Sequence, residues 1–162
     1  MSVERVEPQE LLSFARKFLG VPYKMGAKAK LYAKPQGGYC YQVWNVGGEE
    51  RLVSKVSQID CSGLAYLVFR AKGIDLPHGS YFQVRSRYTR ECFPKEALAT
   101  PGALLFVYDK AKGRVSHVVM SNGKGGVIEA NGYYKKVIER RAKPSSYAIA
   151  RLVEGVHFGK RR

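Results

Sequence analysis

The sequence is poor in the features that mark membrane, disulfide-rich and metal-binding proteins. No apolar run approaches the length that crosses a bilayer. Cysteine is scarce as well: Cys40, Cys61 and Cys92 show no metal-ligand spacing and leave one thiol over if any two pair. We therefore expect no spanning helix, no disulfide framework, and no bound metal or cofactor.

Acidic residues are also few. Lys and Arg together number 28 against 13 Asp and Glu, which gives a formal net charge of +15. Such a surface concentrates polyanions, for example nucleic acid, anionic lipid or an acidic wall polymer. The basic residues are spread along the chain without a nucleic-acid-binding motif, so we do not expect nucleic acid as the partner. Length and a hydrophobic content of 45% predict one globular domain over residues 1–162.

The most informative stretch is Asp60-Cys61-Ser62-Gly63 with the apolar run that follows it. Leu64, Leu67 and Val68 recur at helical spacing, which predicts a helix that begins near Cys61. The first turn of a helix offers unpaired N–H groups and a partial positive charge, and both favour a thiolate over a thiol. Cys61 is therefore a candidate nucleophile, although a buried structural cysteine fits the same pattern.

Around this helix the sequence predicts helices first and strands afterwards. Pro8 suits the first turn of a helix whose apolar face extends to Leu19 and which Gly20 ends. Further patterns predict strands over 39–46, 51–56, 104–108, 116–120, 126–130 and 147–153, and a short helix from Tyr81. This order is typical of an α+β fold with an antiparallel sheet. The aromatic residues of the 39–56 hairpin either pack or line a groove.

A thiol nucleophile needs a base for its proton, and the base needs a partner that orients it. Of the three histidines, His78 lies in a loop and His157 in the C-terminal tail. His117 lies in a predicted strand, and Glu129 follows the next turn, where an antiparallel neighbour of that strand would run. A carboxylate there would favour the charged imidazole, although a His and a Glu on paired strands also occur as an ordinary surface pair.

Several short motifs, in this order along the chain, resemble those of the NlpC-type cell-wall cysteine peptidases of the papain-like superfamily. They are Gly20-Val21-Pro22-Tyr23, Asp60-Cys61-Ser62-Gly63-Leu64, Leu76-Pro77, Pro101-Gly102, Ser116-His117-Val118 and Ile128-Glu129-Ala130. The resemblance implies a papain-like α+β fold in which the Cys helix packs on an antiparallel sheet. It also implies hydrolysis of peptidoglycan stem peptides, typically at the bond from the γ-carboxyl of D-glutamate to a diamino acid.

The resemblance implies roles for individual residues as well. Cys61 matches the nucleophile, His117 the general base and Glu129 the third polar residue. Asn131 is a reserve for that third position, because Glu129-Ala130-Asn131 also resembles the Glu-x-Asn of the related CHAP amidases. Tyr23 would lie close to the thiol, and the backbone N–H groups of Cys61 and Ser62 would hold the oxyanion. No metal or cofactor takes part.

Three departures from the family pattern stand out. Glu129 occupies a position that is often His and sometimes Asn or Gln. Ala103 stands where an Asp usually follows Pro-Gly, and the gap between Gly26 and Asp60 is longer than usual. We interpret residues 28–57 as an insertion that bears on substrate choice more than on the chemistry.

Other functions fit the same sequence. An N-acetylmuramoyl amidase or a Cys/His acyltransferase would use these residues on another bond, and a non-catalytic basic module would bind acidic wall polymer or nucleic acid without using Cys61. We expect peptidoglycan or a muropeptide as partner, and action at the bacterial cell wall or in the periplasm. An antibacterial effector would also have an inhibitor or immunity protein as a partner. No signal peptide is visible at the start, so we expect export by another route, release by a phage, or a trimmed form.

Overall fold

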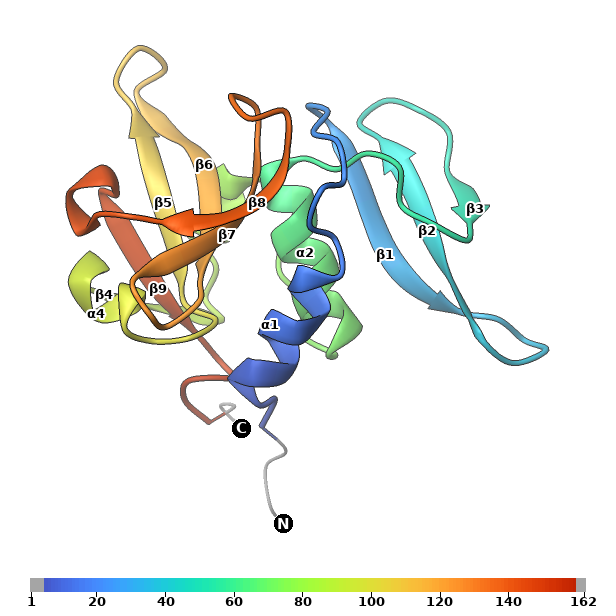
Figure 1. Cartoon of the computed structure of the whole chain (residues 1–162), viewed down its shortest axis with the longest axis horizontal. Coiled ribbons are helices and arrows are strands. Elements are labelled where there is room, and N and C mark those ends of the chain that lie inside the picture. The colour runs from blue at the N-terminus through green and yellow to red at the C-terminus, as the bar shows by residue number, and fades with distance from the viewer. Residues whose placement is uncertain (1–4, 160–162) are drawn as a thin grey trace.

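Two antiparallel sheets and four helices make up the computed structural model, which describes residues 5–159 (Figure 1). The helices are α1 (Pro8–Arg16), α2 (Cys61–Ala71), α3 (Ser80–Gln83) and α4 (Pro94–Leu98), and a 3₁₀ turn spans Pro144–Ser146. One sheet contains β1 (Ala27–Ala33), β2 (Tyr39–Asn45) and β3 (Arg51–Val53) in that order. The other contains β4 (Thr89–Cys92), β9 (Ile149–Val153), β5 (Leu104–Asp109), β6 (Arg114–Ser121), β7 (Gly126–Asn131) and β8 (Lys136–Arg141), again in spatial order.

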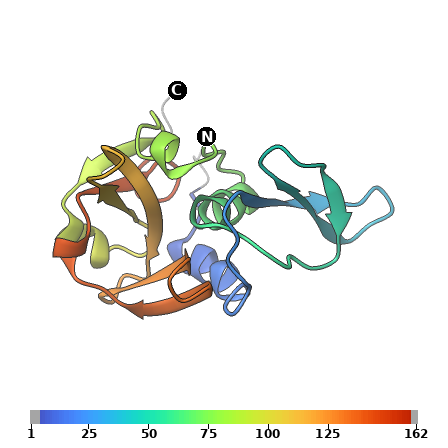
Figure 2. The same cartoon turned by 90° about the horizontal axis from the view of Figure 1, so that it is seen from above.

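Helix α2 lies between the two sheets, with α1 beside it (Figures 1 and 2). It contacts β1 on one side and β6 and β7 on the other. A helix covered on both sides must be apolar around its whole circumference, and residues 62–69 are all buried. The main hydrophobic core therefore joins both sheets through α2.

The first turn of α2 is fixed by a side-chain cap and by close packing against β1. Asp60 is the N-cap, and its carboxylate accepts a hydrogen bond of 2.6 Å from the backbone N–H of Gly63. A Cβ on Gly63 would lie 2.6 Å from the carbonyl oxygen of Ala27, so only glycine permits this approach. The predicted helix start near Cys61 is confirmed.

The α+β class and the antiparallel sheet are also confirmed, with corrections at several elements. Helix α1 ends at Arg16, and Leu19, which we placed on its apolar face, is exposed in the following turn. Strands β1, β4 and β8 and helix α4 were not predicted. Of the helices within residues 5–159, none is long and apolar enough to cross a membrane.

The segment interpreted as an insertion forms the three-stranded sheet and its connections. Tyr41 packs edge-on against Phe18 with ring centroids 5.9 Å apart, and Trp44 packs against Tyr66 at 6.2 Å. Packing therefore describes both side chains, and Trp44 also lines a cavity of about 350 Å³, as the other alternative for the hairpin aromatics predicts. These contacts tie the sheet to the middle of α2 and to the turn that follows α1.

Candidate active site

Cys61 is the first residue of α2 and is partly exposed at a cleft of about 480 Å³. The same cleft is lined by Tyr23, His78, Tyr81 and Arg114 among others. The N–H groups of Cys61 and Ser62 belong to the first helical turn, where the helix itself provides no acceptor. The thiol thus sits beside unpaired backbone donors and is open to a ligand.

His117 on β6 and Glu129 on β7 are joined by a hydrogen bond of 3.0 Å between the ring Nε2 and the carboxylate Oε1. Strands β6 and β7 pair at Met120 and Ile128, which places His117 and Glu129 diagonally on one face of the sheet. Because Nε2 faces Glu129, the other ring nitrogen is left for Cys61, which lies close enough to raise the pKa of the imidazole. The structure therefore brings together the three residues predicted as a catalytic set.

Charge and hydrogen bonding hold His117 and Glu129 in their ionised forms. Burial by itself lowers the pKa of His117, but hydrogen bonding and charge attraction from Cys61 and Glu129 outweigh it and raise that pKa to about 9. Burial likewise raises the pKa of Glu129, yet hydrogen bonds from His117 and Asn131 and the charges of His117 and Arg140 bring it below its ordinary value. At neutral pH the pair is an imidazolium and a carboxylate.

The raised pKa of His117 can be tested by NMR titration of the histidine ring protons. We expect a midpoint near 9 for His117, and midpoints below 6.5 for His78 and His157, whose pKa values burial lowers. In Glu129→Gln the His117 midpoint should fall, because the carboxylate charge is gone.

The pKa of His117 in the folded protein lies above its value of about 6.5 in the unfolded chain. Protonated His117 therefore stabilises the fold fully below pH 6.5, and this contribution is lost as the pH rises through about 9. A His117 midpoint near 6.5 would contradict the assignment.

Asn131 and Arg140 hold the Glu129 carboxylate. Asn131 donates a hydrogen bond of 2.5 Å from its side-chain amide to Oε1, and the Arg140 guanidinium on β8 donates one of 2.9 Å to Oε2. Glu129 is 1% exposed, so both oxygens need such partners. At the predicted third position it is Glu129 whose carboxylate binds the imidazole. Asn131, our reserve candidate for that position, instead donates a hydrogen bond to Glu129. Arg140 was missed, because it lies on a strand that we did not predict.

A buried lysine from β1 holds the two residues that flank Cys61. The Lys28 ammonium donates to both carboxylate oxygens of Asp60, at 2.8 and 2.7 Å, and to the hydroxyl of Ser62 at 2.7 Å. Lys28 is 5% exposed and Asp60 6% exposed. All three ammonium protons are thereby used. The sequence Lys28-Ala29-Lys30 carries no signal that separates this lysine from a surface one.

The remaining predicted site residues lie around the cleft. Tyr23 lines it, and burial, followed by the charges of Cys61 and Asp60, raises the pKa of its phenol. The Ser62 hydroxyl accepts a hydrogen bond from Lys28. The backbone N–H of Ser62 is therefore the group that we expect to bind the oxyanion. The Ser62 carbonyl accepts a hydrogen bond of 3.0 Å from Gln83, a fully buried side chain that we also missed.

The other histidines and cysteines lie outside the His117 cluster. His78 lines the cleft and packs against Tyr66, with ring centroids 4.1 Å apart. His157 is structural: its ring accepts a hydrogen bond from the Val153 N–H, and Nε2 lies 2.9 Å from the carbonyl of Pro101. Cys40 is buried, and burial raises the pKa of Cys92 to about 11; all three cysteines are free thiols.

Solved structures of similar fold cover nearly the whole chain. The peptidoglycan hydrolase RipB from Mycobacterium tuberculosis superposes with a TM-score of 0.65 at 23% identity, over 93% of this chain and 65% of that one. The P60 domain of an antigen from M. avium subspecies paratuberculosis gives a TM-score of 0.65 at 22% identity, over 93% of this chain and 96% of the domain. At these identities the likeness establishes the papain-like fold of this group.

Sequence comparison adds one curated relative and one family. The gamma-D-glutamyl-L-lysine dipeptidyl-peptidase of Bacillus cereus is 34% identical over 71 residues, which are 44% of this chain and 20% of that protein. This chain therefore matches about a fifth of the length of that relative. The model of the NlpC/P60 family matches residues 20–156, a range that contains both sheets, helix α2 and the Cys61, His117 and Glu129 cluster. By this match the chain belongs to the NlpC/P60 family.

Proposed function

We propose that this protein is a peptidoglycan hydrolase that acts at the bacterial cell wall as a cysteine endopeptidase on stem peptides. One observation carries the proposal: the His117 imidazole lies between the Cys61 thiol and the buried Glu129 carboxylate, next to an open cleft. Nucleophile, base and orienting group are the three parts that covalent acyl transfer requires. Family membership and the names of the relatives support the choice of peptidoglycan.

In the first half of the reaction Cys61 acts as a thiolate and His117 as an imidazolium. The sulfur attacks the carbonyl carbon of the scissile peptide bond, and the carbonyl oxygen becomes an oxyanion. The unpaired N–H groups of Cys61 and Ser62 hold that oxyanion. His117 then gives its proton to the departing amine, the C–N bond breaks, and a thioester remains on Cys61.

In the second half a water molecule replaces the amine. His117, now neutral, accepts a proton from the water as its oxygen attacks the thioester carbon. The C–S bond breaks, the product leaves with a new carboxylate, and the thiolate and imidazolium are restored. Glu129 keeps the ring oriented throughout, with Asn131 and Arg140 holding its carboxylate. Tyr23 lies close enough to the thiol for its phenol to contact the substrate.

For the scissile bond we propose the link from the γ-carboxyl of D-glutamate to the diamino acid. The name of the Bacillus cereus relative supports this bond, since it specifies a γ-D-glutamyl linkage for that protein. The test is digestion of purified peptidoglycan, with fragments identified by mass. We expect a newly free γ-carboxyl on D-glutamate and a newly free α-amine on the diamino acid.

The matched controls are Cys61→Ala and Cys92→Ala, which each remove one partly buried thiol. Cys61→Ala should release no fragments, whereas Cys92→Ala should digest the wall like the unmodified protein. Fragments cut between sugar and peptide would replace the proposal with an amidase, and acyl transfer to an added amine or alcohol without hydrolysis would replace it with a transferase. A third outcome is that the protein binds the wall but releases no fragments, that Cys61→Ala binds equally well, and that high salt abolishes the binding. This outcome would replace the proposal with a non-catalytic basic binding module.

A further inference from the structure

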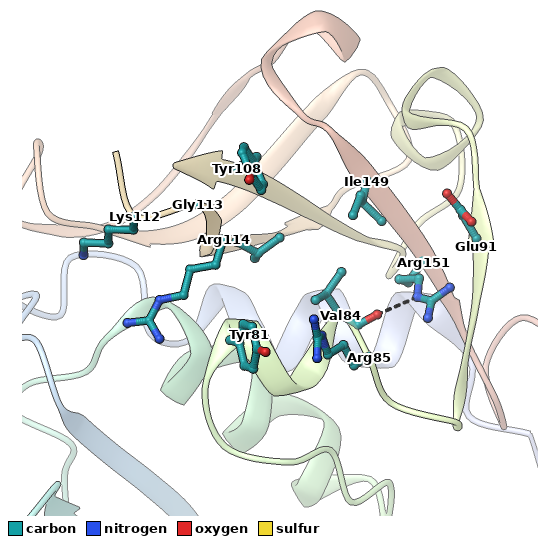
Figure 3. A pocket seen from close by; sticks show the side chains of 11 residues that line it. Tyr81, Val84, Arg85, Glu91, Tyr108, Lys112, Gly113, Arg114, Ile149 and Arg151 are labelled. Atoms are coloured by element: carbon teal, nitrogen blue, oxygen red, sulfur yellow. Dashed lines mark hydrogen bonds between the residues drawn. The ribbon is translucent and has the colours of Figure 1, made fainter. Parts of the chain in front are cut away.

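A second cavity of about 520 Å³ opens beside the proposed catalytic cleft (Figure 3). Tyr81, Lys112, Arg114 and Val115 line both the cavity and the cleft, so the two spaces share a wall. The second cavity therefore lies next to the space in which a ligand would meet Cys61. We call it the basic pocket, and it is further lined by Val84, Arg85, Glu91, Tyr108, Gly113, Ile149 and Arg151.

The basic pocket combines an apolar surface with an excess of positive charge. Val84, Val115 and Ile149 supply aliphatic surface, while four cationic side chains and one carboxylate supply charge. The cations are Arg85, Lys112, Arg114 and Arg151, and the carboxylate is Glu91, which lies at the end of the pocket away from Lys112 (Figure 3). Among the salt bridges of residues 5–159, none involves any of these four cations. Their charge is therefore available to a ligand.

Three of the guanidinium groups are held in place by neighbours. Arg151 on β9 donates a hydrogen bond of 2.9 Å from Nε to the carbonyl of Val84, the bond drawn in Figure 3. The Arg85 and Arg114 guanidinium groups lie 4.4 and 5.8 Å from the ring centroid of Tyr81. Arginine placed in this way binds a carboxylate with little loss of side-chain freedom.

We propose that the basic pocket binds a carboxylate at the end of an aliphatic side chain of the peptide substrate, an inference that rests on the proposed function. The aliphatic surface suits methylene groups and the cations suit the charged end. A phosphate-rich polymer would match the charge but not the apolar surface. Since the pocket shares a wall with the cleft, the carboxylate belongs to the same peptide whose bond Cys61 attacks.

A pair of stem peptides isolates this carboxylate. Diaminopimelate and lysine have the same aliphatic chain and the same side-chain ammonium, and diaminopimelate adds one carboxylate at the end. Glu91 can meet the ammonium of either, so the comparison reports on the added carboxylate. We expect kcat/KM to be about tenfold or more higher for the diaminopimelate peptide, chiefly through KM, and to fall to the lysine value when that carboxylate is amidated.

The double variant Arg85→Gln with Arg114→Gln tests whether these two arginines bind the added carboxylate. It should bring the ratio of the two kcat/KM values close to one. The control, Arg87→Gln with Arg90→Gln, removes two arginines of the same region that do not line the pocket, and should keep the ratio. Equal cleavage of both peptides by the unmodified protein, or a ratio that survives Arg85→Gln with Arg114→Gln, would overturn the inference.

Calorimetry with Cys61→Ala separates this inference from the proposed function, because it measures binding without turnover. If neither peptide is cleaved, the proposed function fails, and the same carboxylate preference in binding would still support the pocket. Equal affinity for both peptides would overturn it. Inorganic polyphosphate is the last probe. If it binds more tightly than the diaminopimelate peptide, and this binding is lost in Arg85→Gln with Arg114→Gln, the inference is overturned in favour of a phosphate-rich polymer as the ligand.

Discussion

His117→Ala is expected to fold normally and to lose about 10,000-fold in kcat/KM on a defined stem peptide. Without the imidazole, Cys61 loses the partner that accepts its proton, and the departing amine loses its proton donor; each role supports rate factors of about 100 to 10,000. The ring is partly exposed, and within residues 5–159 the side chains that interact with it are those of Cys61 and Glu129. Steady-state kinetics, with circular dichroism to verify folding, measures the effect.

Two further variants separate catalysis from a general loss of histidine or charge. His157→Gln removes a structural imidazole and should lower the thermal midpoint while leaving kcat/KM near normal, because that ring bonds the backbone groups of Val153 and Pro101. Glu129→Gln keeps the shape of the side chain but removes its charge, so we expect an intermediate loss of kcat/KM. A His117→Ala protein within tenfold of the unmodified enzyme would exclude His117 as the base.

The part of the fold that could be predicted from sequence is the part with strong local patterns. Helix α2 is apolar on all sides after a capping aspartate, and β5, β6, β7 and β9 are apolar runs between turn residues. Strands β4 and β8 were missed because they are polar strands at the two edges of the sheet. In β8 only Val137 is buried, so hydrophobic periodicity is almost absent there.

In the candidate site, too, the residues that could be predicted from sequence are those with a strong local pattern. Cys61, His117 and Glu129 could be named because short motifs surround them. Two of the groups that hold them, Arg140 and Lys28, could not be named, since each lies on a strand that was not predicted. Arg140 reaches Glu129 from β8, and Lys28 reaches Asp60 from β1. A lysine in a Lys-Ala alternation looks solvated until the tertiary structure buries it.

This burial gives the three-stranded sheet a direct role in placing the start of α2, the helix that begins at Cys61. Lys28 and Asp60 form an ion pair that is closed to solvent, and Asp60 also accepts hydrogen bonds from the N–H groups of Gly26 and Gly63. Asp60 and Ser62, both bonded to Lys28, flank the proposed nucleophile. The position of the Cys61 sulfur therefore depends on residues 27–53 as well as on the six-stranded sheet.

Lys28→Met is accordingly expected to destabilise the protein by about 3 to 5 kcal/mol, because it leaves the Asp60 carboxylate buried without its cation. Urea unfolding measures the change. Lys30→Met is the control: Lys30 lies two residues along β1, is half-buried and forms no ion pair with any residue from 5 to 159. This substitution should change the free energy of unfolding by about 0.5 kcal/mol or less. Adding Asp60→Asn to Lys28→Met should recover part of the loss, since asparagine still caps the helix and carries no charge. A loss below about 1 kcal/mol for Lys28→Met would show that the ion pair does not anchor the sheet to α2.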